Sequence, residues 1–448
     1  MRKLLLLCAL AAPLWGETLL TPAELAEDFA VMKKAYTELH PGLRRYNDDA
    51  SLARNFGALE AQLQRPMSRR EAYVAFSRFL ATIRCGHTYA NFYNQNDEVA
   101  AEVLNGADKV PFTFRIEGKR IFVTGSADPA ITRGLEVKSI NGIATRAILD
   151  DLVHIVKGDG SNDGKRLYDL QVTGRGEFEA FDVYFPLLHP PVDGRYTINR
   201  IKVAAISRAE RASRMKLAPL IPDEQWELRY PNKRTATLRL GTFVTRNMKR
   251  DWKAFLNDAF ADIRKRGVPE LVIDIRGNEG GDDDVVDALL QHLASKDLMP
   301  FPWRELLRYR KVDPSLRPYL RTWDKSFYDR GDTVVGAGNG FYTWAQPEAE
   351  ATTIKASSDA FAGRVTVLID AANSSATFRL ASTLRLNKRA TLVGETTGGN
   401  QRGTNGGNIL FLTLPHSKIE MDIPLIGYFP PSDAPDAGLE PDVATRRR

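Results

Sequence analysis

The chain of 448 residues predicts a multidomain protein of mixed α+β and α/β class. Three observations support this class: helical spacing of apolar residues over 20–95, short β-branched runs over 110–203, and alternating strand and helix patterns from Ala236 onward. A chain of this length is long enough for several hydrophobic cores. We expect four parts, which are a signal segment at 1–16, a helical region at 17–104, a β-rich module at 105–225 and an α/β domain at 226–448.

The first residues have the pattern of an exported protein. Arg2 and Lys3 precede an apolar run from Leu4 to Trp15, which is typical of a secretory signal peptide cleaved near Gly16. This run is too short for a permanent membrane span, and no later stretch is long and apolar enough for one. We therefore expect a periplasmic or secreted protein without a permanent membrane span.

Composition argues against several classes of function. The formal net charge is +6, but acidic and basic residues are interspersed and Arg446–Arg448 is the only basic run, so we expect no nucleic-acid partner. Only Cys8 and Cys85 are present, and the exported chain therefore has no intramolecular disulfide. The sequence lacks HExxH, paired cysteines, a Walker pattern and GxGxxG, so we expect neither a metal nor another cofactor.

Two amphipathic helices are predicted in the N-terminal region. Thr21-Pro22-Ala23-Glu24 is a helix start, and apolar residues then recur at helical spacing until His40-Pro41-Gly42 ends the helix. Ser68 caps a second helix that runs to Ile83, and Glu71 completes a capping box.

The β-rich module is predicted from short segments between Val110 and Val203. These are PFTFRI, RIFVTG, LEVKSING, FDVYFPL and YTINRIKV, and Asn141-Gly142 signals a tight turn. Ala147–Val156 has helical spacing, and Gly158–Asp163 (GDGSND) is a loop. Residues 205–235 receive no assignment.

The α/β domain is predicted from elements that alternate along the chain. They are the strand ATLRLGTF from Ala236, a helix at Met248–Arg266, a strand at Glu270–Ile275, a helix at Asp283–Ser295, a strand at Val365–Ile369 and a helix from Ala376. The stretch from Ser295 to Ala360 is irregular and rich in aromatic residues and arginine, so we expect a loop or lid over a site.

Ser374 and Ser375 lie between the last predicted strand and helix. A serine on a sharp strand-to-helix turn is held at a helix N-terminus, where free N–H groups and the helix dipole favour a developing negative charge. A serine nucleophile needs this geometry. The stretch alone favours the simpler interpretation, in which the serine is a helix cap without chemistry.

Two glycine-rich turns and a histidine are further candidates. Asp274–Gly281 (DIRGNEGG) follows a buried strand, and its glycine pair would either bring N–H groups to an oxyanion or form an ordinary turn. Val393–Asn400 (VGETTGGN) is a second such turn. His87 follows Gly86 and is a candidate general base, although any one of the six histidines is more often structural. Cys85 is a weaker rival nucleophile.

The ordered segments GHT, DIRGNEGG, SSAT and VGETTGGN resemble the tail-specific or C-terminal-processing family of serine peptidases. LHPGL, RGLEVKSINGI and GLEPDV also match, and the resemblance covers nearly the whole chain after the signal segment. It implies a helical N-terminal part, a PDZ-like module and an α/β core of the ClpP/crotonase type. The module around Arg133–Ile143 lacks a clear carboxylate-binding loop, so peptide binding by strand addition stays open.

By this resemblance, Ser375 matches the nucleophile and His87 matches the base of the tricorn-core-like Ser/His branch. The oxyanion hole would use the N–H of Ala376 and one N–H from Gly280 or Gly281.

The chain also departs from the family pattern. Asn400 stands where the Ser–Lys branch has its lysine, and Phe378 stands where the family often has an acid. A carboxylate should orient the histidine, and among the tail acids Asp433, Asp436 and Glu440 we select Glu440.

The resemblance implies an exported serine peptidase that cleaves peptides or unfolded protein chains through an acyl-enzyme. The substrate would be its partner, and the sequence is compatible with a homo-oligomer. Two alternatives stay open. One is a catalytically inactive protein of the same fold that binds peptides or apolar ligands, and the other is a hydrolase of non-peptide esters or amides.

Overall fold

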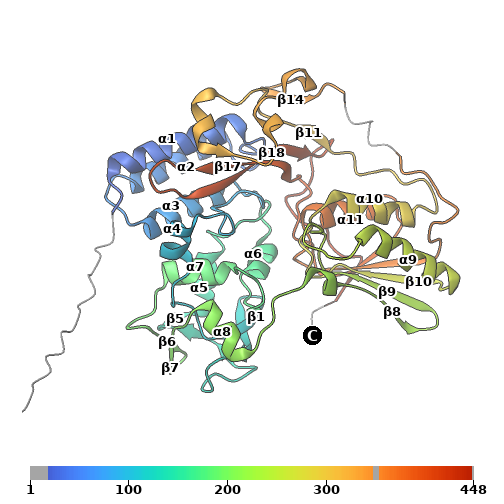
Figure 1. The fold of residues 1–448 in the computed structure, drawn as a ribbon, viewed down its shortest axis with the longest axis horizontal. Coiled ribbons are helices and arrows are strands. Elements are labelled where there is room, and N and C mark those ends of the chain that lie inside the picture. The colour runs from blue at the N-terminus through green and yellow to red at the C-terminus, as the bar shows by residue number, and fades with distance from the viewer. Residues whose placement is uncertain (1–18, 347–352, 446–448) are drawn as a thin grey trace, which may run out of the picture.

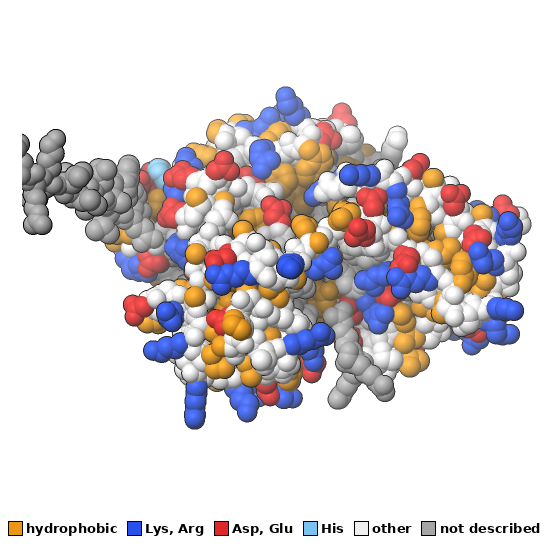
Figure 2. All heavy atoms as spheres, turned by 60° about the horizontal axis from the view of Figure 1, so that its bottom comes forward, with side chains coloured by type: hydrophobic (Ala, Val, Ile, Leu, Met, Phe, Trp, Pro, Cys, Tyr) orange, Lys and Arg blue, Asp and Glu red, His pale blue; other side chains and the backbone are white. Residues whose placement is uncertain are grey.

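The computed structural model describes residues 19–346 and 353–445. The expected signal segment at 1–16 and the basic run Arg446–Arg448 lie outside the described residues. Within these ranges, no helix combines the length and the apolar character needed to cross a membrane. Figure 2 shows acidic and basic side chains interspersed over the face that it presents.

The N-terminal region is helical, and its two predicted caps are confirmed. The helices are α1 (Pro22–Leu39), α2 (Asp49–Gln62), α3 (Arg69–Thr82) and α4 (Asp97–Val99), which continues as the π-helix η1 (Ala100–Leu104). Thr21 and Ser68 each form a capping box with the glutamate three residues on. The apolar faces of these helices contribute to one large hydrophobic core.

The region that follows contains two small sheets and four helices. One sheet has the order β1-β2-β3 and the other the order β5-β4-β6-β7. The strands are β1 (Phe112–Glu117), β2 (Arg120–Ser126), β3 (Glu136–Val137), β4 (Ser139–Ile140), β5 (Ile143–Ala144), β6 (Arg195–Ile198) and β7 (Ile201–Ala204). The helices are α5 (Thr145–Leu152), α6 (Asp163–Asp169), α7 (Ala180–Leu188) and α8 (Arg208–Met215). We refer to this part as the β-rich module.

The strand prediction for FDVYFPL is wrong, because this segment lies in helix α7. All residues from Ala180 to Pro186 are buried, so the apolar run covers every side of the helix and carries no helical period. A buried ion pair between Asp182 and Arg211 of α8 holds the helix in place.

The C-terminal half is built on a six-stranded sheet with the order β19-β16-β15-β10-β9-β8. The strands are β8 (Trp226–Asn232), β9 (Thr235–Leu240), β10 (Glu270–Asp274), β15 (Arg364–Ile369), β16 (Thr391–Gly394) and β19 (Val443–Ala444), and the 3₁₀ helix η2 (Pro222–Gln225) precedes β8. All neighbours are parallel except β8 and β9. Parallel strands end at the same edge of a sheet, so the turns after β10, β15 and β16 meet there.

Helices α9 (Trp252–Lys265), α10 (Asp283–Leu293) and α11 (Ser375–Leu386) pack with this sheet around a second hydrophobic core. We refer to the sheet with these helices as the α/β lobe, which lies on the right in Figure 1. The predicted mixed α+β and α/β class is therefore confirmed, and the predicted strands and helices of this lobe are present with small shifts at their ends.

Strands β17 (Asn405–Thr413) and β18 (Glu420–Phe429) leave the α/β lobe and lie against the N-terminal helices (Figure 1). They form a four-stranded sheet, β11-β18-β17-β12, with β11 (Arg304–Leu306) and β12 (Leu320–Arg321). Tyr36 of α1 donates to the carbonyl of Asp422 in β18 at 2.9 Å. We refer to this sheet and the N-terminal helices as the N-terminal lobe. The returning hairpin brings distant parts of the chain to one site.

The prediction that residues 295–360 are irregular is wrong for the described part of this stretch. Besides β11 and β12, it forms the hairpin β13 (Val334–Gly338)–β14 (Phe341–Trp344) and the 3₁₀ helices η3 (Pro314–Tyr319), η4 (Lys325–Tyr328) and η5 (Gly331–Thr333). Such short elements carry too few residues for a recognisable period.

Candidate active site

Ser375 lies on the turn between β15 and α11. Its φ of 51° places a non-glycine residue in the left-handed region, a strained conformation that concentrates at functional sites. The hydroxyl of the neighbouring Ser374 donates to the carbonyl of Glu279 at 3.1 Å. The hydroxyl of Ser375 makes no hydrogen bond with any residue that the structure describes. Of the two serines, Ser375 is the one whose hydroxyl is free.

Two buried asparagines fix the turn of Ser375 to the neighbouring turns. Asn373 Nδ2 donates to the carbonyl of Asn278, in the turn after β10, at 2.9 Å. The carbonyl of Asn373 accepts the N–H groups of Gly398 and Gly399, in the turn after β16. Because both asparagine side chains are buried, their hydrogen bonds hold the three turns as one unit.

Gly280 and Ala376, two of the residues predicted for the oxyanion hole, lie beside Ser375. A Cβ atom added to Gly280 would be 3.0 Å from both the Cβ of Ser375 and the nitrogen of Ala376, so only glycine fits there. The N–H of Gly280 donates to Asn278 Oδ1 at 2.9 Å. Among the described residues, the N–H groups of Gly281 and Ala376 have no acceptor. Two of the three predicted N–H groups are thus free to hold an oxyanion.

His87 lies on the N-terminal lobe and packs against β17. A Cβ atom added to Gly406 would lie 3.7–3.8 Å from the ring of His87. Burial lowers the pKa of this histidine, against the opposing effect of the Asp159 carboxylate. The imidazole is therefore neutral at pH 7 and able to accept a proton. Within the described residues, its buried Nδ1 has no hydrogen-bond partner, and no hydrogen bond joins the ring to Ser375.

Asp159 is the carboxylate that the structure places beside the His87 segment. Its Oδ1 accepts the N–H of Gly86 at 2.9 Å, and its Oδ2 accepts the hydroxyl of Thr404 at 3.3 Å. The side chain is 3% exposed. Asp159 is not among the predicted site residues, because its loop, GDGSND, has the composition of an ordinary polar turn.

The structure does not bring Glu440 to His87. Glu440 is exposed, and its backbone carbonyl accepts from Arg385. Asn400, at the position of the family lysine, is buried and donates to Asp436 at 2.8 Å. Phe378 is also buried and packs against Gly399.

Cys85 is buried, and burial raises the pKa of its thiol. A buried, protonated thiol is a poor nucleophile, so Ser375 has no competitor there.

Lys165 of α6 is a second group that the sequence analysis missed. Its Nζ lies 2.6 Å from Asp169 and 2.9 Å from Glu279, and its side chain is only 7% exposed. Burial lowers the pKa of Lys165, but the two carboxylates outweigh burial and raise it above its ordinary value. Lys165 therefore stays charged and cannot accept the proton of Ser375 as a general base.

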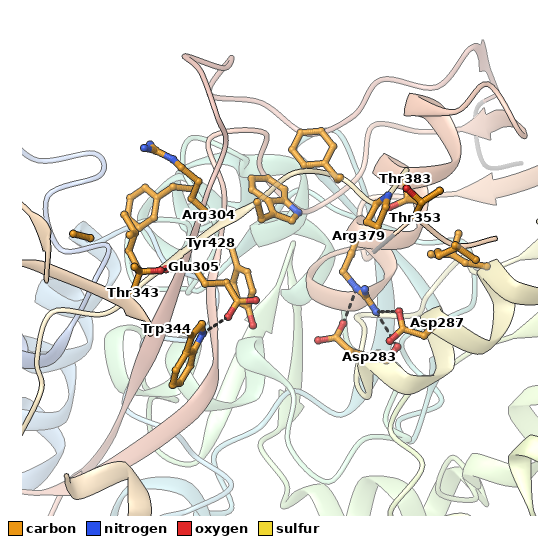
Figure 3. Close-up of a pocket in the computed structure, with 18 of the residues that line it drawn as sticks. Asp283, Asp287, Arg304, Glu305, Thr343, Trp344, Thr353, Arg379, Thr383 and Tyr428 are labelled. Atoms are coloured by element: carbon orange, nitrogen blue, oxygen red, sulfur yellow. Dashed lines mark hydrogen bonds and ion pairs between the residues drawn. The ribbon is translucent and has the colours of Figure 1, made fainter. Parts of the chain in front are cut away.

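A large cleft separates the α/β lobe from the segment that carries β11 and β14, and its volume is about 1290 Å³. In Figure 3, Arg379, Asp283 and Asp287 line one wall, where Arg379 donates to Asp287 at 2.8 Å. Glu305 and Trp344 line the other wall and share a hydrogen bond of 2.7 Å. Arg379 lies one helical turn after Ser375 on α11, and Ser375 itself is not among the residues that line the cleft.

No group of three or more His, Cys, Asp and Glu side chains among the described residues has the arrangement of a metal site. The candidate groups for chemistry are the free hydroxyl of Ser375, the neutral imidazole of His87 and the free N–H groups of Gly281 and Ala376.

These features define the class of the protein, an α/β serine peptidase. Residues 234–445 match the model of peptidase family S41, and they include the strands of the six-stranded sheet other than β8, the turn of Ser375 and the glycine-rich turns. The match confirms, over this part of the chain, the resemblance to C-terminal-processing serine peptidases found in the sequence.

Solved structures with a similar fold cover most of the chain. CPAF complexed with lactacystin has a TM-score of 0.61 at 12% identity, over 94% of this chain and 94% of that chain. Mature CPAF has a TM-score of 0.59 at 12% identity, over 94% of this chain and 92% of that chain. The photosystem II D1 C-terminal processing protease has a TM-score of 0.40 at 16% identity, over 94% of this chain and 93% of that chain. Comparison with curated protein sequences gives no match.

Proposed function

We propose that this chain is an exported serine peptidase in which Ser375 is the nucleophile and His87 the general base. The observation that carries the proposal is the strained turn of Ser375, which carries a free hydroxyl and lies against Gly280 and the free N–H of Ala376. Gly280 packs closely against Ser375 and Ala376 and forms part of the same proposed oxyanion pocket. Such an arrangement fits acyl transfer, because donors that await a developing charge lower the barrier.

The reaction follows from these roles. Ser375 Oγ attacks the carbonyl carbon of the scissile amide while His87 takes the hydroxyl proton, and the carbonyl oxygen becomes an oxyanion held by the two N–H groups. The C–N bond then breaks, and the imidazolium gives its proton to the leaving amine. Water, deprotonated by His87, attacks the acyl-enzyme and releases the acid, and the proton returns to Ser375.

His87 and Ser375 come from different lobes, and the catalytic hydrogen bond between them is not formed in the structure. Such bonds are often long in a free enzyme and tighten with substrate. We assign the support of His87 to Asp159 rather than Glu440, because Asp159 binds the N–H of the preceding residue, Gly86.

The cleft of about 1290 Å³, which Arg379 and Thr383 of α11 help to line, is the proposed site for an extended peptide or an unfolded segment of a protein chain. Aromatic residues such as Phe341 and Trp344 line it together with polar groups, which suits a peptide backbone with mixed side chains. Peptide binding by the PDZ-like module remains a separate expectation, as does assembly into a homo-oligomer.

The expected signal peptide at 1–16 supports export to the periplasm or outside the cell. Fractionation of cells that express the full chain would test this expectation. Recovery of the unprocessed chain in the cytoplasm would contradict it.

One observation favours the alternative, a binding protein of the same fold: the ring of His87 is bonded neither to Ser375 nor to an orienting carboxylate among the described residues. Peptide hydrolysis by the purified chain distinguishes the two functions. The peptidase loses hydrolysis in Ser375→Ala but keeps peptide binding, whereas the binding protein binds peptides equally well in both forms and cleaves in neither.

A further inference from the structure

Helix α6 joins the β-rich module to all three turns of the candidate site. Its cap residue, Asn162, donates to the carbonyl of Thr397 at 2.7 Å, in the turn after β16. Gly164 faces Ala371, in the turn of the nucleophile, and Tyr168 faces Gly277, in the turn after β10. Figure 1 places α6 on the side of the module that faces the α/β lobe. Through these contacts, α6 can fix the positions of the turns after β10, β15 and β16 relative to one another.

Lys165 is the charged residue at the centre of this contact. Its Nζ binds Asp169 on its own helix and Glu279 in the turn after β10, at 2.6 and 2.9 Å. Its stem packs on Gly398, where an added Cβ atom would lie 2.8 Å from the Lys165 Cδ. Asp169 is buried with Lys165, whereas the Glu279 side chain is 57% exposed, so the ion pair with Lys165 is the contact that holds the Glu279 carboxylate against α6.

Glu279 stands directly before the two glycines of the oxyanion turn. Its carboxylate binds Lys165, and its backbone carbonyl accepts the hydroxyl of Ser374 at 3.1 Å. The residue is therefore held at both ends, by α6 through the side chain and by the nucleophile turn through the backbone. A shift of Glu279 would turn the peptide groups that carry the N–H of Gly281.

We infer that Lys165 is a positioning residue, which acts through Glu279 to hold the oxyanion turn in place beside Ser375. The inference rests on the proposed function, because it assigns the turn its role in catalysis. Lys165 does not touch the reacting atoms. Its effect lies in the orientation of the N–H donors, and a misplacement of about 1 Å is enough to slow an enzyme on the order of 10²-fold.

The test compares Lys165→Met, Glu279→Gln and the double variant with the wild-type chain. Methionine keeps the packing of the stem on Gly398 and removes the charge, and glutamine keeps the shape of Glu279 without its charge. Lys119→Met is the matched control, because Lys119 pairs with Asp150 in the same module but its pair does not involve the catalytic turns. The readouts are kcat and KM for a peptide substrate, the rate of labelling by a fluorophosphonate, and the thermal midpoint.

We expect each single variant to lower kcat and the labelling rate at least about tenfold per folded molecule, with KM nearly unchanged. The double variant should be no worse than Lys165→Met, because Glu279→Gln breaks a contact that Lys165→Met has already removed. Labelling of both single variants at the wild-type rate would overturn the inference, as would losses explained entirely by a lower thermal midpoint. If the wild-type chain itself neither labels nor cleaves, the proposed function fails instead.

Discussion

A methyl group on Gly280 would lie 3.0 Å from the backbone nitrogen of Ala376, whose N–H is free and adjoins Ser375. The φ of Gly280 is +110°, a conformation that other residues rarely adopt. Glycine at this position therefore has two functions. It leaves space for the proposed oxyanion pocket, and it allows the positive φ that the turn requires.

Gly280→Ala should lower kcat/KM by about 10²-fold or more, because the new methyl group displaces the turn that holds the oxyanion donors. The matched control is Gly57→Ala on helix α2, where an added Cβ atom meets nothing within 4 Å. That change should leave activity intact and slightly favour the helix. Equal activity in both variants would contradict the proposed pocket.

The neighbouring serines should differ sharply in their variants. Ser374→Ala removes a hydrogen bond to the Glu279 carbonyl, which costs about 1 kcal/mol of stability and leaves the nucleophile in place. Ser375→Ala removes the nucleophile and should abolish peptide hydrolysis without loss of stability. Steady-state hydrolysis and thermal unfolding of both variants check this pair, and an active Ser375→Ala enzyme would refute the assignment.

The acid limb of the pH–rate profile should lie below pH 6.5, because burial lowers the pKa of His87 and the base is active when neutral. The Asp159 carboxylate raises this pKa in part, so Asp159→Asn should move the acid limb to still lower pH. The pH profile of kcat/KM, measured for the wild-type enzyme and for Asp159→Asn, tests whether the acid limb of the variant lies at the lower pH. An acid limb that moves upward in Asp159→Asn would show that Asp159 does not act on the base in this way.

Asp422, on β18, should make the protein less stable as the pH rises. Burial raises its pKa from 3.8 to about 7, so the folded state binds the proton more tightly than the unfolded state. This contribution to the free energy of unfolding is complete below about pH 4 and is lost as the pH rises through about 7, by about 4 kcal/mol in total. Asp422→Asn should remove this dependence. Denaturant unfolding at pH 5 and pH 8 compares the two forms, and an unchanged difference between them would argue against the raised pKa.

Trp344→Ala should raise KM for peptide substrates severalfold with a smaller effect on kcat, because Trp344 lines the cleft and not the reacting centre. Trp323→Ala is the control, since Trp323 is 63% exposed and lies outside the cleft lining. If the two variants have the same KM, the cleft is not the peptide site.

The α/β lobe could be predicted well from the sequence, because its strands are buried runs and apolar residues recur at helical spacing in its helices. The turn of Ser375 and the glycine turns were found for the same reason: each follows a buried strand, and parallel strands end at one edge. Helix α7 could not be predicted, because its burial on all sides erases the period that distinguishes a helix from a strand.

Asp159 and Lys165 could not be predicted either. Asp159 lies in a polar loop. Its proposed role depends on the hydrogen bond that it accepts from Gly86, a residue far from it in the sequence. Lys165 looks like an ordinary helix residue until the fold places Glu279 and Gly398 around it. Contacts between lobes depend on tertiary packing, which local patterns do not encode.

The most direct test of the central claim is fluorophosphonate labelling of the purified protein, followed by peptide mass mapping, with Ser375→Ala and His87→Ala alongside. The account predicts a single labelled site at Ser375, with labelling absent in Ser375→Ala and strongly reduced in His87→Ala. Labelling at another residue, or no labelling of a folded wild-type protein in the presence of peptide, would contradict it.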